Sequence, residues 1–181
     1  ISNFFSNLRQ PIVIVNDFLQ GKGRQGGADT TRFLINTTVG IGGFFDVARK
    51  AGFEPHDEDF GQTFAVWGMS EGPYVVWPVI GGRSLRASAG WVGDQFAYPL
   101  NYLDNDSTYW SLWTLDIVHL RAGYMDQEKA LETAASQDKY LFIREAYRQN
   151  RRNLIYDGNP PRPKLFEEDE ETKPNGKKKK K

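Results

Sequence analysis

The chain has 181 residues, enough for one domain of about 150 residues with a tail, and its 23 basic and 23 acidic residues cancel. The charges are not spread evenly. Residues 1–161 carry 15 Lys and Arg against 18 Asp and Glu, whereas residues 162–181 carry 8 against 5. The body therefore lacks the basic surface of a nucleic-acid-binding protein. With no cysteine, the chain has no disulfide and no thiolate chemistry.

No stretch of the sequence predicts a transmembrane helix. The longest run without a charged residue, residues 33–45, has thirteen positions and includes polar ones, whereas a bilayer requires about 20 apolar residues. A signal-peptide pattern is also missing, and the chain begins at Ile1 without methionine. These features predict a processed protein or a fragment.

The first segment, residues 2–20, fits either of two structures. Ser2 is a candidate N-cap, and Pro11 precedes the β-branched run 12–15. That run suits a short strand, and it suits equally a proline-kinked helix that ends near Gly21.

A second helix is expected over residues 30–38, with Phe33 and Leu34 facing inward. The glycines that follow break the chain before a short turn over residues 44–50.

A third helix is predicted after the acidic residues 57–59, whose charges suit the first turn of a helix. Phe60, Phe64 and Trp67 follow at spacings of four and three, so they share one face. An extended segment is expected over residues 74–78, because prolines flank it and forbid a regular helix.

The remaining chain is the most plainly helical. Ser84 is the candidate N-cap of a helix that ends by Pro99. Apolar residues then recur every three or four positions over residues 110–124, good helix formers fill 127–135, and the helical pattern returns over 140–154.

The aromatic residues of these C-terminal helices are predicted to be core residues: Trp110, Trp113 and Tyr147. Residues 157–181 combine prolines, an acidic block and five terminal lysines, which predicts a disordered charged tail after a helical domain over residues 1–156.

Residues 33–82 combine glycines with large aromatic rings. Nine of the eighteen glycines lie between Gly40 and Gly82. Glycine inside an element costs about 1 kcal/mol relative to alanine, so this mixture favours tight turns and close backbone approach. We interpret the stretch as a passage or clamp for an apolar ligand. Its aromatic residues suit a lipid-facing or ligand-facing role as well as they suit a core.

The segment 21–26, GKGRQG, matches the dinucleotide fingerprint, and Asp46 stands near the expected acidic position. A Rossmann unit requires a strand that enters the turn directly, but residues 16–20 intervene. The pattern favours a loop between two helices, with Lys22 and Arg24 in solvent.

The segment 68–72, GMSEG, matches the nucleophile elbow of serine hydrolases, with His119 later in the chain. An elbow requires a helix that starts directly after Ser70, whereas Gly72 and Pro73 lead into an extended segment. A lipid-active serine hydrolase that uses Ser70 therefore stays an alternative.

The segment His56-Asp57-Glu58-Asp59 contains residue types that bind metals. Adjacent positions at the start of a helix point in different directions, and the second histidine of the chain is His119, whereas zinc requires three or four converging ligands. A solvated first turn of a helix is the preferred interpretation. We expect no metal and no cofactor.

Seven stretches resemble one known family. They are SNFFSNL at residues 2–8, VNDFLQG at 15–21, RFLINTTVG at 32–40, GGFFDVA at 42–48, HDEDFGQT at 56–63, GPY at 72–74 and REAY at 144–147. In this order they resemble the MlaA (VacJ) lipoproteins of the Gram-negative outer membrane, over about residues 1–156.

The resemblance implies an all-α, ring-shaped protein of short, kinked amphipathic helices with glycine-rich connections and a central amphipathic channel. It implies a location in the periplasmic leaflet of the outer membrane. There the family removes misplaced phospholipids from the outer leaflet and passes them to the soluble periplasmic carrier MlaC, beside a trimeric porin and without covalent chemistry. A ring within one leaflet needs no membrane-spanning segment, and tryptophan and phenylalanine suit the interface.

The resemblance also suggests which residues meet the lipid. Glycines would let the helices bend around the channel, aromatic side chains would contact acyl chains, and polar side chains would serve headgroups, whose charge is costly to bury unpaired. These candidates are Gly40, Gly42 and Gly43; Phe44, Phe45, Phe60, Phe64 and Trp67; and Asn36, Gln62 and Thr63.

The sequence departs from the family pattern at its start. The family's N-terminal part, with its lipidated cysteine, has no counterpart here, so a lipid anchor is expected although its cysteine is not in this sequence. A purely structural companion of a porin is a further alternative to lipid transport.

Overall fold

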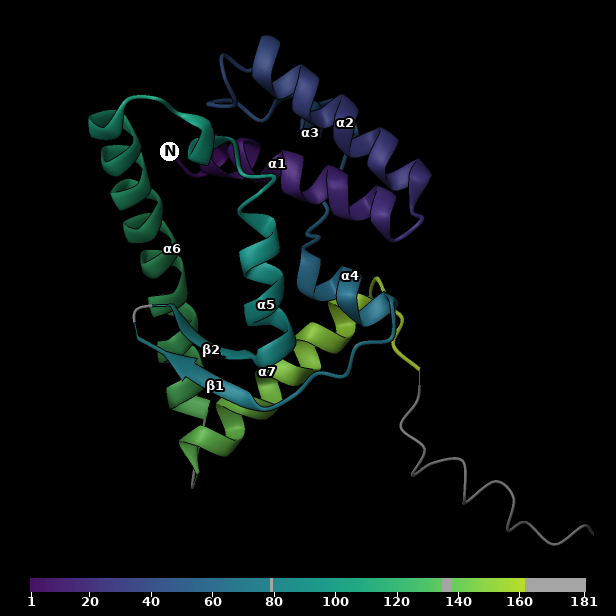
Figure 1. Cartoon of the computed structure of the whole chain (residues 1–181), viewed down its shortest axis with the longest axis vertical. Helices are drawn as coiled ribbons and strands as arrows, with labels where there is room; N and C mark the ends of the chain where they lie inside the picture. The colour runs from purple at the N-terminus through teal and green to yellow at the C-terminus, as the bar shows by residue number, and fades with distance from the viewer. Residues whose placement is uncertain (79, 135–137, 162–181) are drawn as a thin grey trace, which may run out of the picture.

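The computed structural model describes residues 1–78, 80–134 and 138–161, and within them the chain is mostly helical (Figure 1). Its elements in chain order are α1 (Ser2–Leu19), α2 (Gly23–Thr38), α3 (Val47–Lys50), α4 (Phe60–Val66), β1 (Tyr74–Trp77), β2 (Gly81–Ser84), α5 (Leu85–Asp94), the 3₁₀ turn η1 (Pro99–Tyr102), α6 (Asp106–Ala134) and α7 (Lys139–Ile155). The helical fold class is confirmed, with a small antiparallel hairpin in addition.

Helix α1 runs through Pro11, so the first segment is the proline-containing helix and not the strand. Its predicted cap is wrong, because the helix begins at Ser2 itself and Ile1 occupies the cap position without a side-chain hydrogen bond. The helix ends at Leu19, and Gly21 has a φ of 78°, the left-handed conformation that glycine adopts at low cost after a helix.

Helix α2 lies alongside α1 and starts at Gly23, well before the predicted start at residue 30 (Figure 1). The expected burial of Leu34 is wrong, since its side chain is 55% exposed, whereas Asp29 and Asn36 are buried. This helix therefore turns polar side chains inward.

The extended segment 74–78 contains β1, as predicted, and β1 pairs with β2, which the sequence did not predict. In this antiparallel pair Tyr74 lies opposite Ser84 and Trp77 opposite Gly81. Ser84 also caps α5, as predicted, because its Oγ accepts a hydrogen bond of 3.2 Å from the amide of Ala87.

Helices α6 and α7 cover one side and the base of the molecule in the view of Figure 1. Both helices were predicted. The side chain of Tyr124 lies outside the described part of the structure, and so does residue 135, the last residue of the predicted run of helix formers. The predicted core role of two tryptophans is wrong, because Trp110 is 58% and Trp113 39% exposed. Tyr147 is half-buried and accepts a hydrogen bond from the amide of Ser84 at 3.1 Å.

Helix α7 ends at Ile155, next to the predicted domain boundary at residue 156. Residues 162–181 lie outside the described part of the chain. Residues 157–161 lie within it, and Asp157 forms an ion pair of 2.5 Å with Lys22 at the turn between α1 and α2. Contacts with the helical domain therefore continue past residue 156.

Among the described helices, none is both long and apolar enough to cross a membrane.

Candidate functional site

Burial in this protein is inverted. Among the described residues, thirteen polar or charged residues are buried against five apolar ones, and twenty-nine large hydrophobic side chains are exposed. A water-soluble domain buries mainly apolar residues and rarely exposes extended apolar surface. The exterior therefore suits an apolar environment, and hydrogen bonds must hold the interior together.

Those hydrogen bonds, together with the interaction between the carboxyl groups of Asp17 and Asp29, form one connected group, which we call the polar seam. It joins α1, α2, α4, α5 and the connection between α3 and α4. Its members are Gln10, Asn16, Asp17, Gln20, Lys22, Gln25, Asp29, His56, Glu58, Thr63 and Asp94.

At the α4 end of the seam, Asn16 links three helices. Its Oδ1 accepts a hydrogen bond of 2.6 Å from Thr63 Oγ1, and its Nδ2 lies 3.4 Å from Asp94 Oδ1. That oxygen of Asp94 also accepts the amide of Phe60 at 2.9 Å. Burial raises the pKa of Asp94 to about 7. Near neutral pH this carboxyl group therefore holds a proton for part of the time.

In the middle of the seam, Glu58 is the acceptor for three side chains. It receives hydrogen bonds from Gln20 at 2.8 Å, from Lys22 at 2.7 Å and from Gln25 at 3.0 Å. The prediction that Lys22 lies in solvent is wrong, because its ammonium group is shared between Glu58 and Asp157.

At the α2 end, two fully buried carboxyl groups meet. Asp29 accepts hydrogen bonds from Gln10 at 2.8 Å and lies 2.7 Å from His56 Nδ1. Asp17 Oδ1 accepts from Gln25 at 2.8 Å, whereas its Oδ2 receives no donor among the described residues. The carboxyl group of Asp17 also interacts with that of Asp29. Burial, then the charges of Asp29 and Glu58, raise the pKa of Asp17 to about 7.

The residues 56–59 do not form the solvated first turn that the sequence predicts, since Glu58 is only 4% exposed. Helix α4 starts directly after these residues, at Phe60. Asp59 caps the helix, because its side chain accepts a hydrogen bond of 2.9 Å from the amide of Gln62. Asp59 also forms two hydrogen bonds, 2.5 and 2.9 Å long, with Arg151 of α7. Burial alone would raise the pKa of Asp59, but the Arg151 guanidinium outweighs it and lowers that pKa. In the described part of the chain no group of His, Asp and Glu could hold a metal ion.

The three predicted polar residues are buried within the protein. Thr63 belongs to the polar seam, and Gln62 donates to the carbonyl of Asp57 at 2.7 Å. Asn36 bridges Asp46 and the amide of Ala48, at 3.1 and 2.9 Å. A headgroup role for these side chains stays a prediction, and it requires the helices around them to open.

The predicted aromatic residues lie mostly on the outside. Phe44, Phe45 and Trp67 are between 51% and 60% exposed, while Phe60 and Phe64 are half-buried. Phe60, Phe64 and Trp67 form a continuous row along α4, with ring centroids 5.9 and 6.0 Å apart. The ring of Phe44 stacks on that of Phe4 in α1 at 5.1 Å.

The three predicted glycines shape the loop between α2 and α3. Gly42 and Gly43 have φ of 67° and 89°. A Cβ on Gly40 would overlap the carbonyl of Phe45, and one on Gly43 would overlap the side chain of Asn7. The loop therefore packs tightly against α1.

The structure separates the predicted site into two groups. One group is the row of aromatic rings along α4, together with Gln62 and Thr63. The other group is the α2–α3 loop, with Asn36, Phe44 and Phe45. Figure 1 shows them on opposite sides of α1. A single lipid site would therefore have to extend along α1.

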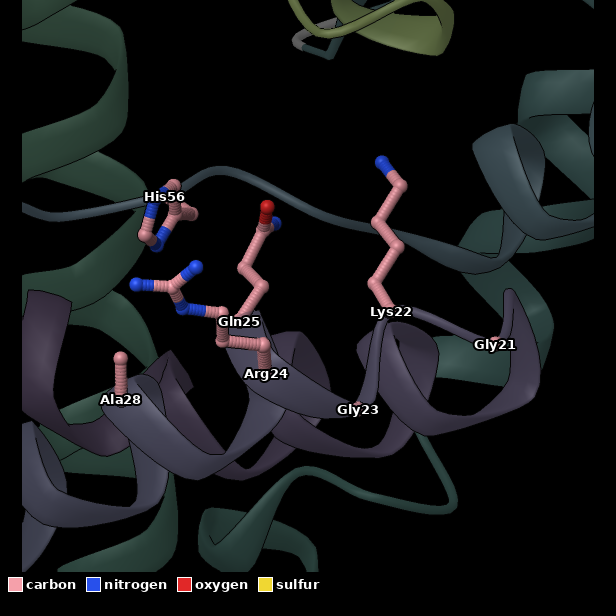
Figure 2. Close-up of a pocket in the computed structure, with 7 residues that line it drawn as sticks. All are labelled: Gly21, Lys22, Gly23, Arg24, Gln25, Ala28 and His56. Atoms are coloured by element: carbon pink, nitrogen blue, oxygen red, sulfur yellow. The ribbon is translucent and has the colours of Figure 1, made fainter.

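Figure 2 shows an open pocket at the start of α2, lined by Gly21, Lys22, Gly23, Arg24, Gln25, Ala28 and His56. It includes the segment that matches the dinucleotide fingerprint. A helix precedes this segment instead of a strand, so the Rossmann geometry is not present. Arg24 is exposed, as predicted, and its side chain points toward His56.

Ser70 does not occupy a nucleophile elbow. It is exposed in an irregular segment after α4, and the next regular element is β1 and not a helix. His119 lies on α6, where its ring stacks on Phe5 at 5.7 Å.

Apart from Thr63, the residues of the polar seam were not predicted from the sequence as site residues, although a signal exists. In α1 and at its C-terminal cap, Gln10, Asp17 and Gln20 recur at helical spacing, and in α2 Asp29 and Asn36 do the same. Here polar residues repeat at the helical period on the buried face, whereas apolar residues do so in a helix of an ordinary soluble domain.

The fold and its burial define a mostly helical protein with a polar interior and an apolar exterior. The family model described as MlaA lipoprotein matches residues 1–154. The chain belongs to the MlaA lipoprotein family.

Two relatives carry the description "Intermembrane phospholipid transport system lipoprotein MlaA". The Escherichia coli K12 protein is 40% identical over 172 residues, and the Haemophilus influenzae protein is 30% identical over 162 residues. The matches cover 90% and 87% of this chain and 64% of each relative. This chain thus spans somewhat less than two thirds of the relatives' length.

A solved structure described as "Structural basis for maintenance of bacterial outer membrane lipid asymmetry" has a similar fold. Its TM-score is 0.70 at 34% sequence identity, and the match covers 88% of this chain and 78% of that one.

Proposed function

We propose that this protein removes misplaced phospholipids from the outer leaflet of the outer membrane and passes them to a periplasmic lipid carrier. It lies in the periplasmic leaflet, where its helices form a ring around an amphipathic channel. A trimeric porin is its membrane partner, and the soluble carrier MlaC receives the lipid. Membership of the MlaA family and the phospholipid transport named for its relatives support this proposal.

The observation that carries the proposal is the inverted burial. Polar residues dominate the buried set and large hydrophobic side chains are exposed all along the described chain. Hydrocarbon around the protein would remove the cost of the exposed apolar surface. The protein therefore suits immersion in a leaflet, and no helix has to cross the membrane.

The same observation divides the roles of the candidate residues. The exposed rings Phe44, Phe45 and Trp67, together with Phe64, contact acyl chains. The headgroup needs polar contacts along its path, because an unpaired phosphate costs several kcal/mol to bury. Gln62 and Thr63 have no exposed surface, so they contribute to such a path only when α4 moves away from α1.

Mass spectrometry of lipids extracted from detergent-purified protein tests this cargo directly. We expect phospholipid to copurify in a defined ratio to protein. A purely structural porin companion would yield only the lipid that any membrane protein retains. The absence of specific copurifying phospholipid would refute the transport proposal.

Substitutions on the two aromatic groups test the path. Phe45→Asp and Phe64→Asp should reduce clearance of outer-leaflet phospholipid several-fold in cells, because a carboxylate replaces an apolar wall. Leu141→Asp is the matched control, since Leu141 is 44% exposed on α7 and outside both groups. Undiminished clearance with Phe64→Asp would count against α4 as part of the channel.

Ser70→Ala separates transport from hydrolysis. Transport predicts unchanged lipid clearance and no lipid hydrolysis by the purified protein, with or without the substitution. A hydrolytic activity that disappears in Ser70→Ala would overturn the transport proposal.

A further inference from the structure

The connection between α3 and α4 is attached to the α1–α2 hairpin by two side chains. His56 lies 2.7 Å from Asp29 of α2, and Glu58 binds Lys22 and two glutamines of the hairpin. Directly after these residues, Asp59 caps α4 and binds Arg151. The attachment therefore sets the position of α4 relative to the hairpin.

The charges at this attachment do not balance. Three carboxyl groups, those of Asp17, Asp29 and Glu58, are at most 4% exposed. The cations that face them are Lys22 and, when protonated, His56, and Lys22 is also shared with Asp157. Two like charges in contact and away from water strongly oppose each other. Even with His56 protonated, at least one of the three carboxyl groups has to carry a proton for the cluster to stay neutral.

The cluster also has a route for that proton. The side chain of His56 is 37% exposed and lines the open pocket of Figure 2, while its Nδ1 contacts the fully buried Asp29. Asp29 in turn interacts with Asp17. An imidazole can exchange protons between solvent on one side and a carboxylate on the other.

We propose that Asp17, Lys22, Asp29, His56 and Glu58 form a pH-sensitive clasp, which holds the α3–α4 connection on the α1–α2 hairpin while a proton is shared between Asp17 and Asp29. When that proton is lost, Asp17, Asp29 and Glu58 are all charged against Lys22, and the connection loosens. The clasp is a property of the fold and does not depend on the identity of the cargo.

The direction of the effect follows from Asp17. Its pKa in the folded protein is raised to about 7, above the ordinary value of 3.8, so the folded state retains a proton that the unfolded state has lost. Stability from this group is therefore greatest at low pH and declines as pH rises from about 4 to about 7. The clasp closes in acid and loosens in alkali.

Electron spin resonance can measure the clasp, because the chain contains no cysteine and accepts a pair of introduced ones. Glu54→Cys in the connection and Gly27→Cys on α2 are both exposed, and Gly27 has open space around it. In the spin-labelled full chain in lipid nanodiscs, we expect a narrow distance distribution at pH 5.5 and one at least twofold broader at pH 8. Identical distributions at the two pH values would overturn the proposal.

Asp17→Asn tests the cause, since an amide resembles the protonated acid and cannot ionise. We expect this variant to keep the narrow distribution at both pH values. Asp138→Asn, the same change at the exposed cap of α7, should retain the response of the unsubstituted chain. A broadening with Asp17→Asn equal to that of the unsubstituted protein would overturn the role of Asp17.

A measurement on the unsubstituted protein covers the case in which Asp17→Asn does not fold. The chain has two histidines, so NMR can follow the ring of His56 with His119 as an internal reference. The clasp predicts a change in the His56 signals near pH 7, where Asp17 loses its proton, that the His119 signals do not show, because the His56 ring contacts Asp29. His56 and His119 signals with the same dependence on pH would contradict a link between His56 and the buried pair.

Discussion

Asp116, on α6, binds Arg9 of α1 across 107 positions of the sequence. Both carboxylate oxygens lie within 3.1 Å of Arg9 Nη2, and Oδ2 also accepts a hydrogen bond of 2.8 Å from the hydroxyl of Tyr98. Burial and the neighbouring Asp116 raise the pKa of Tyr98, so this hydroxyl stays a donor. One buried carboxylate thus holds α6 to α1 and to the segment before η1.

Asp116→Ala should lower the free energy of unfolding by about 2–4 kcal/mol, because it removes the acceptor of the buried Tyr98 hydroxyl and an ion-pair partner of Arg9. The lower end of this range allows for solvent around Arg9, whose side chain is 37% exposed. Urea unfolding in detergent measures the change. Glu54→Ala is the control, since its ion pair with Arg49 is 3.9 Å long and exposed at both ends, and it should cost less than about 1 kcal/mol. Equal effects of the two substitutions would contradict the role of Asp116.

Asp59→Asn should weaken the attachment of α7 to α4 and leave the α4 cap intact, because asparagine caps helices as well as aspartate does. The Arg151 guanidinium lowers the pKa of Asp59 below 3.8, so the native pair adds stability above about pH 4 and loses it as pH falls through the lowered value. We expect the stability difference between wild type and Asp59→Asn to be about 1–3 kcal/mol at pH 7 and to shrink toward pH 3.

Thermal unfolding from pH 3 to pH 7 measures this difference. Arg151→Lys should lose a similar amount of stability at pH 7, because lysine cannot donate the two parallel hydrogen bonds to Asp59. A difference that does not change with pH would show that the ion pair is not its source.

The sequence predicts the elements that depend on neighbouring residues. Ser84 caps α5 because its hydroxyl reaches an amide three positions later, a contact that the order of residues alone can indicate. The rings of Phe60, Phe64 and Trp67 share a face for the same reason. Local spacing thus accounts for most of the helices.

Burial could not be predicted in the same way, because the usual rule assumes water outside. Leu34 was expected inside and lies outside, while the acidic Asp29 of the same helix is fully buried. The polar period was visible in the sequence, but its partners come from other elements. Asp29 is satisfied by Gln10 of α1 and by His56, nineteen and twenty-seven positions away. Only the packed structure shows these pairs.

Asp94→Asn should stabilise the protein at alkaline pH. Burial raises the pKa of Asp94 to about 7, so the folded state holds a proton that the unfolded state loses near pH 4, and the cost of ionisation accumulates between these values. The variant cannot ionise. Relative to wild type, its free energy of unfolding should rise by roughly 3–4 kcal/mol between pH 4 and pH 8. A constant difference over this range would show that Asp94 does not carry the proton.

Gly90→Ala should destabilise the crossing of α4 and α5. A Cβ at Gly90 would overlap the backbone nitrogen of Gly61, and backbone atoms cannot move aside as a flexible side chain can. We expect a loss of about 1–3 kcal/mol or more in the free energy of unfolding. Gly27→Ala is the matched control, since Gly27 lies within α2 with open space around it. That variant should gain about 0.4–1 kcal/mol, because alanine restricts the unfolded chain. If both substitutions stabilise the protein, α4 and α5 do not approach each other at Gly61 and Gly90 as closely as the structure shows.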